Sequence, residues 1–177
     1  IYYVMVKKYP RDMVGYGSKN TKVIWPNNAK LAIQIVLNYE EGAENSVLHG
    51  DRYSESFLSE IIGAQPIRGR HINMESLYDY CSNRWFWRLH DLFQEKKIPI
   101  TIFGVAMALD RNPEVCNTIN NSNYEVACHV WRWIADQKLK KSVENKHMDL
   151  ALKTMNTIFE QRPIYRTTVR SHDKARA

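Results

Sequence analysis

The sequence has few cysteines and lacks a membrane or export segment. Cys81, Cys116 and Cys128 are too few and too widely spaced for a disulfide framework or a zinc ribbon. Free thiols of this kind fit a reducing compartment. The N-terminus shows no charged, apolar and small-residue order of a signal peptide. The longest apolar stretch, residues 98–109, is too short to cross a bilayer. We therefore expect a cytoplasmic chain with no membrane partner.

Several motifs of common enzymes are also missing. The chain has no GxSxG nucleophile elbow, no Walker loop and no HExxH zinc motif. Glycine is scarce, and Gly15-Tyr-Gly17 is not followed by the third glycine of a dinucleotide fingerprint. The sequence therefore supports these enzyme classes only weakly.

The net charge of +6 does not by itself indicate nucleic acid. The lysines are dispersed, and the densest group, residues 138–141, lies on a predicted helix. We interpret this group as a solvated helix face. The chain also has no RNA-binding aromatic signature and no helix-turn-helix spacing, so we expect no nucleic-acid partner.

Apolar segments with strand and helix patterns alternate along the chain. Buried strands are predicted at residues 31–37, 98–105 and 124–129, and helices at residues 51–63, 83–97, 113–119 and 136–161. Pro163 ends the last helix, and a fourth strand is predicted from Ile164. This order predicts an α/β fold, either a parallel sheet or a (β/α) barrel. Residues 1–29 form an irregular lead-in, and residues 30–177 form the domain.

Acidic side chains and an imidazole follow two of the predicted strands. Glu40 and Glu41 come directly after the first strand, and His129 ends the third. Ligands of parallel α/β folds bind at the carboxyl ends of the strands. A carboxylate near an imidazole can serve general acid–base catalysis or can hold a metal ion. The spacing alone fits equally well a purely structural interpretation, in which Glu40 and Glu41 are an exposed loop pair and His129 is a hydrogen-bonded core residue.

Several longer blocks of sequence occur in order between residues 9 and 163, among them "YPRDMVGYG", "VLNYEEGAENSVLHGD", "RHINMESLYDY", "FWRLHDLF" and "IPITIFGVAMALDRNPEV". These blocks resemble the PuuE-type allantoinases of the polysaccharide deacetylase (NodB-homology) superfamily. The resemblance implies a distorted (β/α) barrel of which this chain is an N-terminal part, because family members are much longer.

The resemblance also implies roles for individual residues. Glu40 falls on the general-base Asp of the "FDDG" motif in metal-dependent deacetylases, and Glu41 falls on the metal-binding Asp. His129 falls on the first histidine of HxxxH. The second histidine falls on Trp133, which cannot bind a metal. The allantoinase-like branch has the pattern "SHGxRWID" here and is regarded as not needing a metal. We therefore expect no cofactor, with zinc as the alternative.

This chain departs from the family pattern in several places, one of which is Arg84-Trp85 in place of the usual small residues. "SHG" is replaced by Cys128-His129-Val130, and the third motif, "RPxGWYTGR" in this branch, is disturbed. "RPIYRTTVR" offers Arg170 or Arg166 to hold an amide oxygen of the substrate.

The activity that the resemblance implies is hydrolysis of a carbon–nitrogen bond, the opening of the hydantoin ring of allantoin to allantoate. Glu40 or Glu41 would activate water, His129 would act as acid or oxyanion partner, and Trp133 would wall the pocket. The implied partners are a small cyclic ureide substrate and, for the full-length protein, further copies in a homo-oligomer. A metal-dependent polysaccharide or peptidoglycan N-deacetylase and an inactive truncated relic are the alternatives.

Overall fold

The computed structural model describes residues 13, 15–19, 22–135 and 139–159. The chain divides into two compact units, Ile1–Ile33 and Gln34–Ala177. In the first unit every described residue is exposed, and its one described element is a 3₁₀ turn, η1 (Pro26–Asn28). Pro26 is suited to the first position of that turn because its φ is already fixed near the helical value. The second unit carries the sheet and the candidate site.

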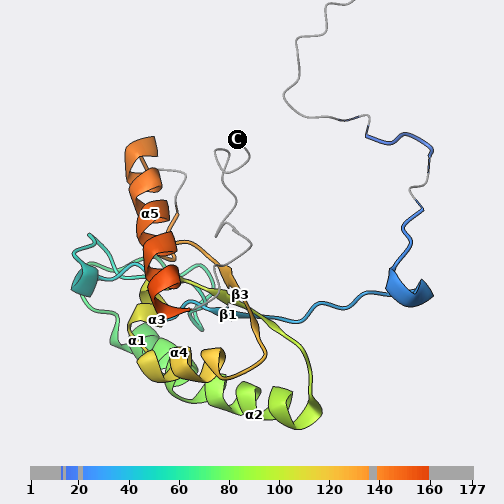
Figure 1. The fold of residues 1–177 in the computed structure, drawn as a ribbon. Helices are drawn as coiled ribbons and strands as arrows, with labels where there is room; N and C mark the ends of the chain where they lie inside the picture. The colour runs from blue at the N-terminus through green and yellow to red at the C-terminus, as the bar shows by residue number, and fades with distance from the viewer. Residues whose placement is uncertain (1–12, 14, 20–21, 136–138, 160–177) are drawn as a thin grey trace, which may run out of the picture. The chain divides into compact units, whose positions relative to one another are not determined.

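A parallel sheet of three strands forms the centre of the second unit (Figure 1). The strands are β1 (Val36–Tyr39), β2 (Thr101–Gly104) and β3 (Glu125–Cys128), in the spatial order β1-β2-β3. The register pairs Tyr39 with Gly104 and Gly104 with Cys128, so all three strands end at the same level. The segments that follow them therefore emerge side by side.

The two faces of the sheet differ in character because side chains alternate along a strand. Tyr39, Ile102 and Cys128 lie on the face that packs against helices, and all three are buried. Asn38 and Phe103 lie on the other face, where Asn38 is exposed and Phe103 is half-buried. The polar residues that follow the strands on this second face therefore point away from the apolar core.

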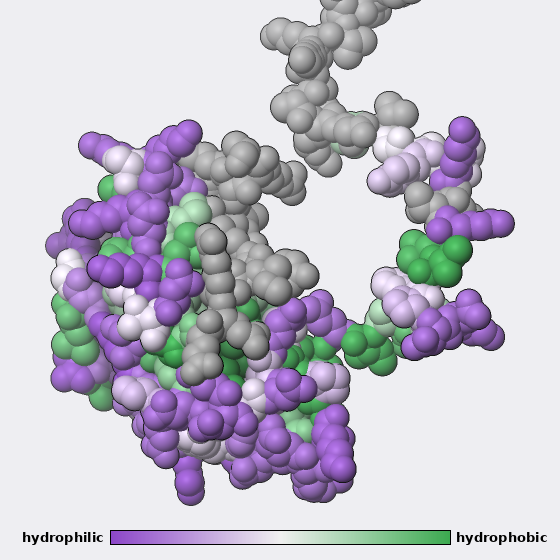
Figure 2. Space-filling view, viewed as in Figure 1, coloured by the Kyte–Doolittle hydropathy of each residue, from purple (hydrophilic) through white to green (hydrophobic). Residues whose placement is uncertain are grey.

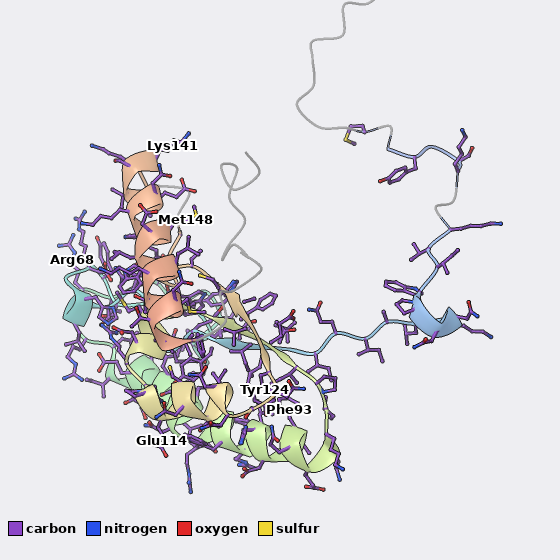
Figure 3. The ribbon with its side chains drawn as sticks, viewed as in Figure 1. Arg68, Phe93, Glu114, Tyr124, Lys141 and Met148 are labelled. Carbon is purple, nitrogen blue, oxygen red and sulfur yellow. The ribbon has the colours of Figure 1, made fainter. Side chains whose placement is uncertain are left out.

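The first helical cover runs without a break from α1 (Ile72–Tyr80) through a π-helical segment, η3 (Cys81–Trp85), into α2 (Phe86–Lys96). Phe86 anchors this cover, because its ring meets that of Tyr39 edge-on at 5.7 Å. Tyr124, just before β3, lies near the C-terminal half of α2 (Figure 3), where its hydroxyl is 3.0 Å from His90 Nδ1.

Three further helices follow β2 and β3. They are α3 (Ala106–Asp110), α4 (Pro113–Asn120) and α5 (Lys141–Ile158). Asn112 caps α4 by accepting a hydrogen bond from the Val115 amide, and Pro113 occupies the first turn. On the viewed face of the molecule, the surface over α2 and α5 is mostly hydrophilic (Figure 2), as expected of helices that bury one side only.

The first predicted strand is partly wrong in its bounds. Residues 31–37 were expected to be buried, but Leu31 and Ile33 are exposed and the strand begins at Val36. Val36 pairs with Thr101, the first residue of β2, so β2 has no earlier residue with which the chain before Val36 could pair.

The helix expected at residues 51–63 is absent, and a helix missing from the sequence prediction occurs at α1. Serines and an acid in the 51–63 segment bond to backbone groups instead, as when Ser54 Oγ donates to Gly69 O at 2.6 Å. Glu55 likewise accepts from the amides of Ser56 and Phe57. Leu58 has a φ of 68°, which no right-handed helix allows. The segment is an irregular loop with its apolar side chains exposed.

Candidate active site

Glu40 and His129 meet at the carboxyl edge of the sheet. Glu40 Oε1 lies 3.0 Å from His129 Nε2, and both side chains are largely buried. Asn38 Nδ2 also donates to Glu40 Oε1, at 3.3 Å. Both contacts therefore arrive at the same carboxylate oxygen. Among the described residues, no hydrogen bond is recorded to Glu40 Oε2, which can face water or a substrate.

The acid and the imidazole come from strands that are not neighbours. Parallel strands lie about 4.8 Å apart, so β1 and β3 are separated by roughly 10 Å across β2. The long side chains of Glu40 and His129 close this gap just beyond Gly104, the last residue of β2. The Phe103 ring lies beneath, with its centroid 5.6 Å from that of His129. The Phe103 ring therefore gives the His129 ring an apolar neighbour on one side.

Glu41 points elsewhere, because neighbouring residues at a strand end face opposite sides. It lines a cavity of about 240 Å³ together with Tyr39, Cys81, Trp85 and other residues of β1 and α2. Burial, opposed by backbone hydrogen bonds and aided by the charges of Glu40 and Glu44, raises the pKa of Glu41. Burial, and then the nearby Glu41, likewise raises the pKa of the Cys81 thiol. The two expected carboxylates thus occupy different surroundings.

The backbone next to His129 is strained. Val130 has a φ of 72°, a left-handed conformation that β-branched residues strongly disfavour. Position 130 is where the family pattern "SHG" has glycine, which adopts such a φ without cost. The Val130 carbonyl accepts from the Ala106 amide at 2.9 Å, and the Trp131 carbonyl from the Met107 amide at 3.1 Å. These bonds to α3 hold the strained turn in place.

Trp133 is buried rather than exposed to a pocket. Its side chain and backbone together are 6% exposed, and its ring meets those of Phe57 and Tyr78 edge-on at 5.6 and 6.1 Å. The Trp133 amide donates to the Ala43 carbonyl at 3.0 Å, which joins the segment after β3 to the segment after β1. Arg166 and Arg170 lie outside the described residues.

The residues at the family's metal positions do not fit a metal centre. Those positions carry Glu41, His129 and Trp133, and an indole has no lone pair to give. Within residues 13–159 as far as they are described, no group of three or more His, Cys, Asp or Glu side chains is placed to hold a metal ion.

Of the helices in the described ranges, none combines the length and apolar character needed to cross a bilayer.

Sequence reasoning missed an ionic contact close to the site. Arg132 bonds to Asp51 through two nitrogens, Nη1 to Oδ1 at 3.0 Å and Nη2 to Oδ2 at 2.5 Å. Both residues lie within blocks that matched the family pattern, but neither was assigned a role. Their pairing joins positions 81 residues apart, and no spacing rule connects them.

Comparison with known proteins gives consistent matches. A family model described as polysaccharide deacetylase matches residues 72–175. A putative polysaccharide deacetylase from Schizosaccharomyces pombe is 36% identical over 142 residues, which cover 78% of this chain and 44% of that protein. The crystal structure of PuuE allantoinase is 42% identical with a TM-score of 0.90, covering 96% of this chain and 57% of its own.

A second solved structure is equally similar. A probable polysaccharide deacetylase from Pseudomonas aeruginosa PAO1 is 45% identical with a TM-score of 0.89, covering 95% of this chain and 56% of its own. These matches confirm the expected α/β fold and the family resemblance. The chain spans about half the length of these relatives, so it corresponds to part of their (β/α) barrel.

Proposed function

The chain belongs to the polysaccharide deacetylase family, and on that premise we propose that its site hydrolyses a carbon–nitrogen bond in a cyclic ureide, as in the opening of allantoin to allantoate. The observation that carries this proposal is the contact between Glu40 and His129 at the carboxyl edge of the sheet. The similarity to a solved allantoinase supports the choice of substrate class. The three cysteines are in the thiol form, which supports a cytoplasmic setting.

Glu40 is the better placed general base. Its Oε1 is occupied by His129 and Asn38, which leaves Oε2 to take a proton from water. The resulting hydroxide attacks the ring carbonyl carbon, and the oxyanion of the tetrahedral intermediate needs a nearby donor. When the intermediate collapses, the carbon–nitrogen bond breaks and the departing nitrogen takes up a proton. His129 serves both needs as a hydrogen-bond donor to the oxyanion and as the source of that proton, and the proton that Glu40 took from water passes back to His129 through their contact.

Glu41 remains the alternative base. A carboxylate whose pKa is raised binds a proton more readily, and burial gives Glu41 this property. Its cavity, however, lies on the helical side of β1.

The other residues that the resemblance implies have supporting roles. Trp133 packs behind the site and does not line it with an exposed ring, because little of the residue is exposed. Arg170 or Arg166 would hold an amide oxygen of the substrate, and the active assembly would be a homo-oligomer.

The test is hydrolysis of allantoin by the purified protein, compared with Glu40→Gln and Glu41→Gln. Glutamine keeps the size of the side chain and removes the proton acceptor, so loss of the base lowers the rate about 10²–10⁴-fold. We expect this loss in Glu40→Gln, with unchanged circular dichroism. Normal rates in both variants would disprove a catalytic role for this segment.

A second candidate function is N-deacetylation of a polysaccharide, favoured by the descriptions of the family model and of the S. pombe relative. It requires a third metal ligand where the chain has Trp133. An N-acetylglucosamine oligomer, assayed with and without added zinc, separates the two functions. Release of acetate only with zinc would favour the deacetylase, and no turnover of either substrate would favour an inactive relic.

A further inference from the structure

The contact between Glu40 and His129 depends on how the segments after β1 and β3 are held together. The two side chains belong to strands that do not pair, so the sheet ladder does not fix their separation directly. Rotamer changes or a shift of either segment would break a single 3.0 Å contact. Contacts that pass over the end of β2 must therefore set the distance.

Arg132 makes several of these contacts. Its guanidinium binds Asp51 through two nitrogens and also donates from Nη2 to the Glu44 carbonyl at 3.0 Å. Asp51 and Glu44 belong to the segment after β1, whereas Arg132 lies three residues beyond His129. The guanidinium fork matches a carboxylate in one orientation only, which adds geometric precision to the attraction.

The Arg132–Asp51 contact is also partly shielded from solvent and fixed to the backbone on both sides. The Arg132 side chain is 11% exposed and the Asp51 side chain 23% exposed. Asp51 is fixed to its own segment, because its Oδ2 accepts from the Ser46 amide at 2.9 Å. A few residues away, the parallel bridge between Glu44 and Trp133 joins the same two segments through the backbone. Shielding from water makes such an ion pair stronger than an exposed one.

We propose that Arg132, through its paired hydrogen bonds to Asp51, is a positioning residue that sets the distance between Glu40 and His129. Neither Arg132 nor Asp51 needs to touch the substrate. The inference rests on the proposed function for its kinetic consequence. Its structural consequence, a changed Glu40–His129 contact, does not require turnover.

The first test is kinetic and uses Arg132→Lys and Asp51→Asn. Lysine keeps the charge but loses the fork, and asparagine keeps the shape but loses the charge. A displacement of about 1 Å can cost a reaction about 10²-fold. We expect kcat for allantoin to fall about 10- to 100-fold in each variant, with KM changed less than about 3-fold, and similar losses in the single and double variants.

A double-variant comparison separates this inference from the proposed function. In the Glu40→Gln background there is no base to position, so Arg132→Lys should lower the residual rate little further. If Glu40→Gln itself keeps the normal rate, Glu40 is not the base, and the role that the proposed function gives to it fails. The positioning inference alone fails if Glu40→Gln loses activity while Arg132→Lys keeps it. It also fails if Arg132→Lys lowers the rate by the same factor in the wild-type and the Glu40→Gln backgrounds.

The second test observes His129 directly in the chain itself. The ¹⁵N resonance of its Nε2 reports the hydrogen bond to Glu40, and Glu40→Gln identifies the signal. We expect Arg132→Lys to shift this resonance and Arg88→Lys to leave it unchanged. Arg88 is a matched control, because it is an exposed arginine of α2 placed over the Trp85 ring. An unchanged resonance in Arg132→Lys would overturn the inference, whatever the activity.

Discussion

At the scale of single residues, Leu58 has a strained backbone conformation. Its exposed side chain buries too little surface to offset the free-energy cost of that strain. Its φ is 68° and 67% of its surface is exposed. The left-handed region costs a residue with a side chain roughly 1–2 kcal/mol, and glycine enters it freely. We expect Leu58→Gly to raise the free energy of unfolding by about 0.5–1 kcal/mol, measured by urea denaturation.

Ile62→Gly is the control for this substitution. Ile62 is also an apolar residue of the same loop, 100% exposed, but it is not among the residues with positive φ. Glycine should therefore lower the stability there or leave it unchanged, because it only adds freedom to the unfolded chain. Equal losses of stability in the two variants would show that Leu58 is not strained.

His49 gives the site region a dependence on pH. Burial, and then the charge of Arg111, lowers the pKa of His49 below its ordinary value of 6.5. Its Nδ1 lies 2.9 Å from the Glu44 carbonyl and its Nε2 lies 2.7 Å from Arg111 Nη1. The neutral ring can donate to the carbonyl and accept from the arginine. Protonation would place two donors against each other.

The sign of the effect follows from this lowered pKa. Below about pH 6.5 the unfolded chain binds a proton at His49 that the folded chain resists, so stability falls as the pH drops. Above that pH the residue contributes no dependence. We expect the difference in unfolding free energy between pH 7 and pH 5 to shrink in His49→Asn, measured by urea denaturation. An unchanged difference would contradict the assignment.

Arg111→Met tests the same assignment from the partner's side. It removes the second cause of the lowered pKa and leaves burial in place, so it should reduce the dependence only in part. A larger reduction than in His49→Asn would mean that another group titrates.

The sequence predicted that Glu40 and His129 lie at the same edge of the sheet, but it did not predict how the residues there pair. Chain order alone placed Glu40, Glu41 and His129 at the carboxyl edge, because parallel strands end together. The alternation of side chains at a strand end separates the two glutamates, and this rule was available from the sequence. The pairing of Arg132 with Asp51 was not, because it depends on how two long segments fold over β2.

At the scale of elements, α2 ends in a conformation that suits glycine better than its own residue. Lys97, its C-cap, is exposed with φ 53° and ψ 41°, and its amide bonds back to the carbonyls of Gln94 and Phe93. Helices commonly end this way, usually with glycine. We expect Lys97→Gly to raise the free energy of unfolding by about 0.5–1 kcal/mol in thermal or urea unfolding.

The neighbouring position supplies the control. Lys96 is the last residue of α2 and has helical geometry, so Lys96→Gly should lower stability by about 1 kcal/mol. A destabilised Lys97→Gly would show that the lysine side chain contributes more than its backbone costs.

Helices were predicted well where a local sequence signal marks them, and poorly where polar side-chain contacts determine the backbone conformation. The helix from Pro113 was found by its proline, and α5 by its long apolar period. Residues 51–63 have an apolar period as well, but serine and glutamate side chains of this segment hydrogen-bond to backbone groups and compete with a helix. The α1 helix buries Met74 and Tyr78, four positions apart, a pattern too short to stand out beside its polar neighbours.

At the scale of the whole molecule, we expect no stoichiometric metal. Two acceptable ligands at the family's metal positions bind zinc weakly, because structural and catalytic zinc sites use at least three protein ligands. Elemental analysis of the purified chain should give well under one zinc per chain, and a chelator should leave the thermal transition unchanged. One tightly held metal per chain would contradict this expectation.

The crossing of Glu40 and His129 over β2 has a consequence for the order of events in refolding. The two residues are about 90 positions apart, so bringing them together requires closure of a long loop, with an entropic cost that grows as the logarithm of its length. Helices such as α2 form through local contacts and need no such closure. After a jump out of denaturant, far-ultraviolet dichroism should therefore recover before the His129 resonance shift caused by Glu40. Simultaneous recovery would mean that β1, β2 and β3 assemble in the same step as the helices.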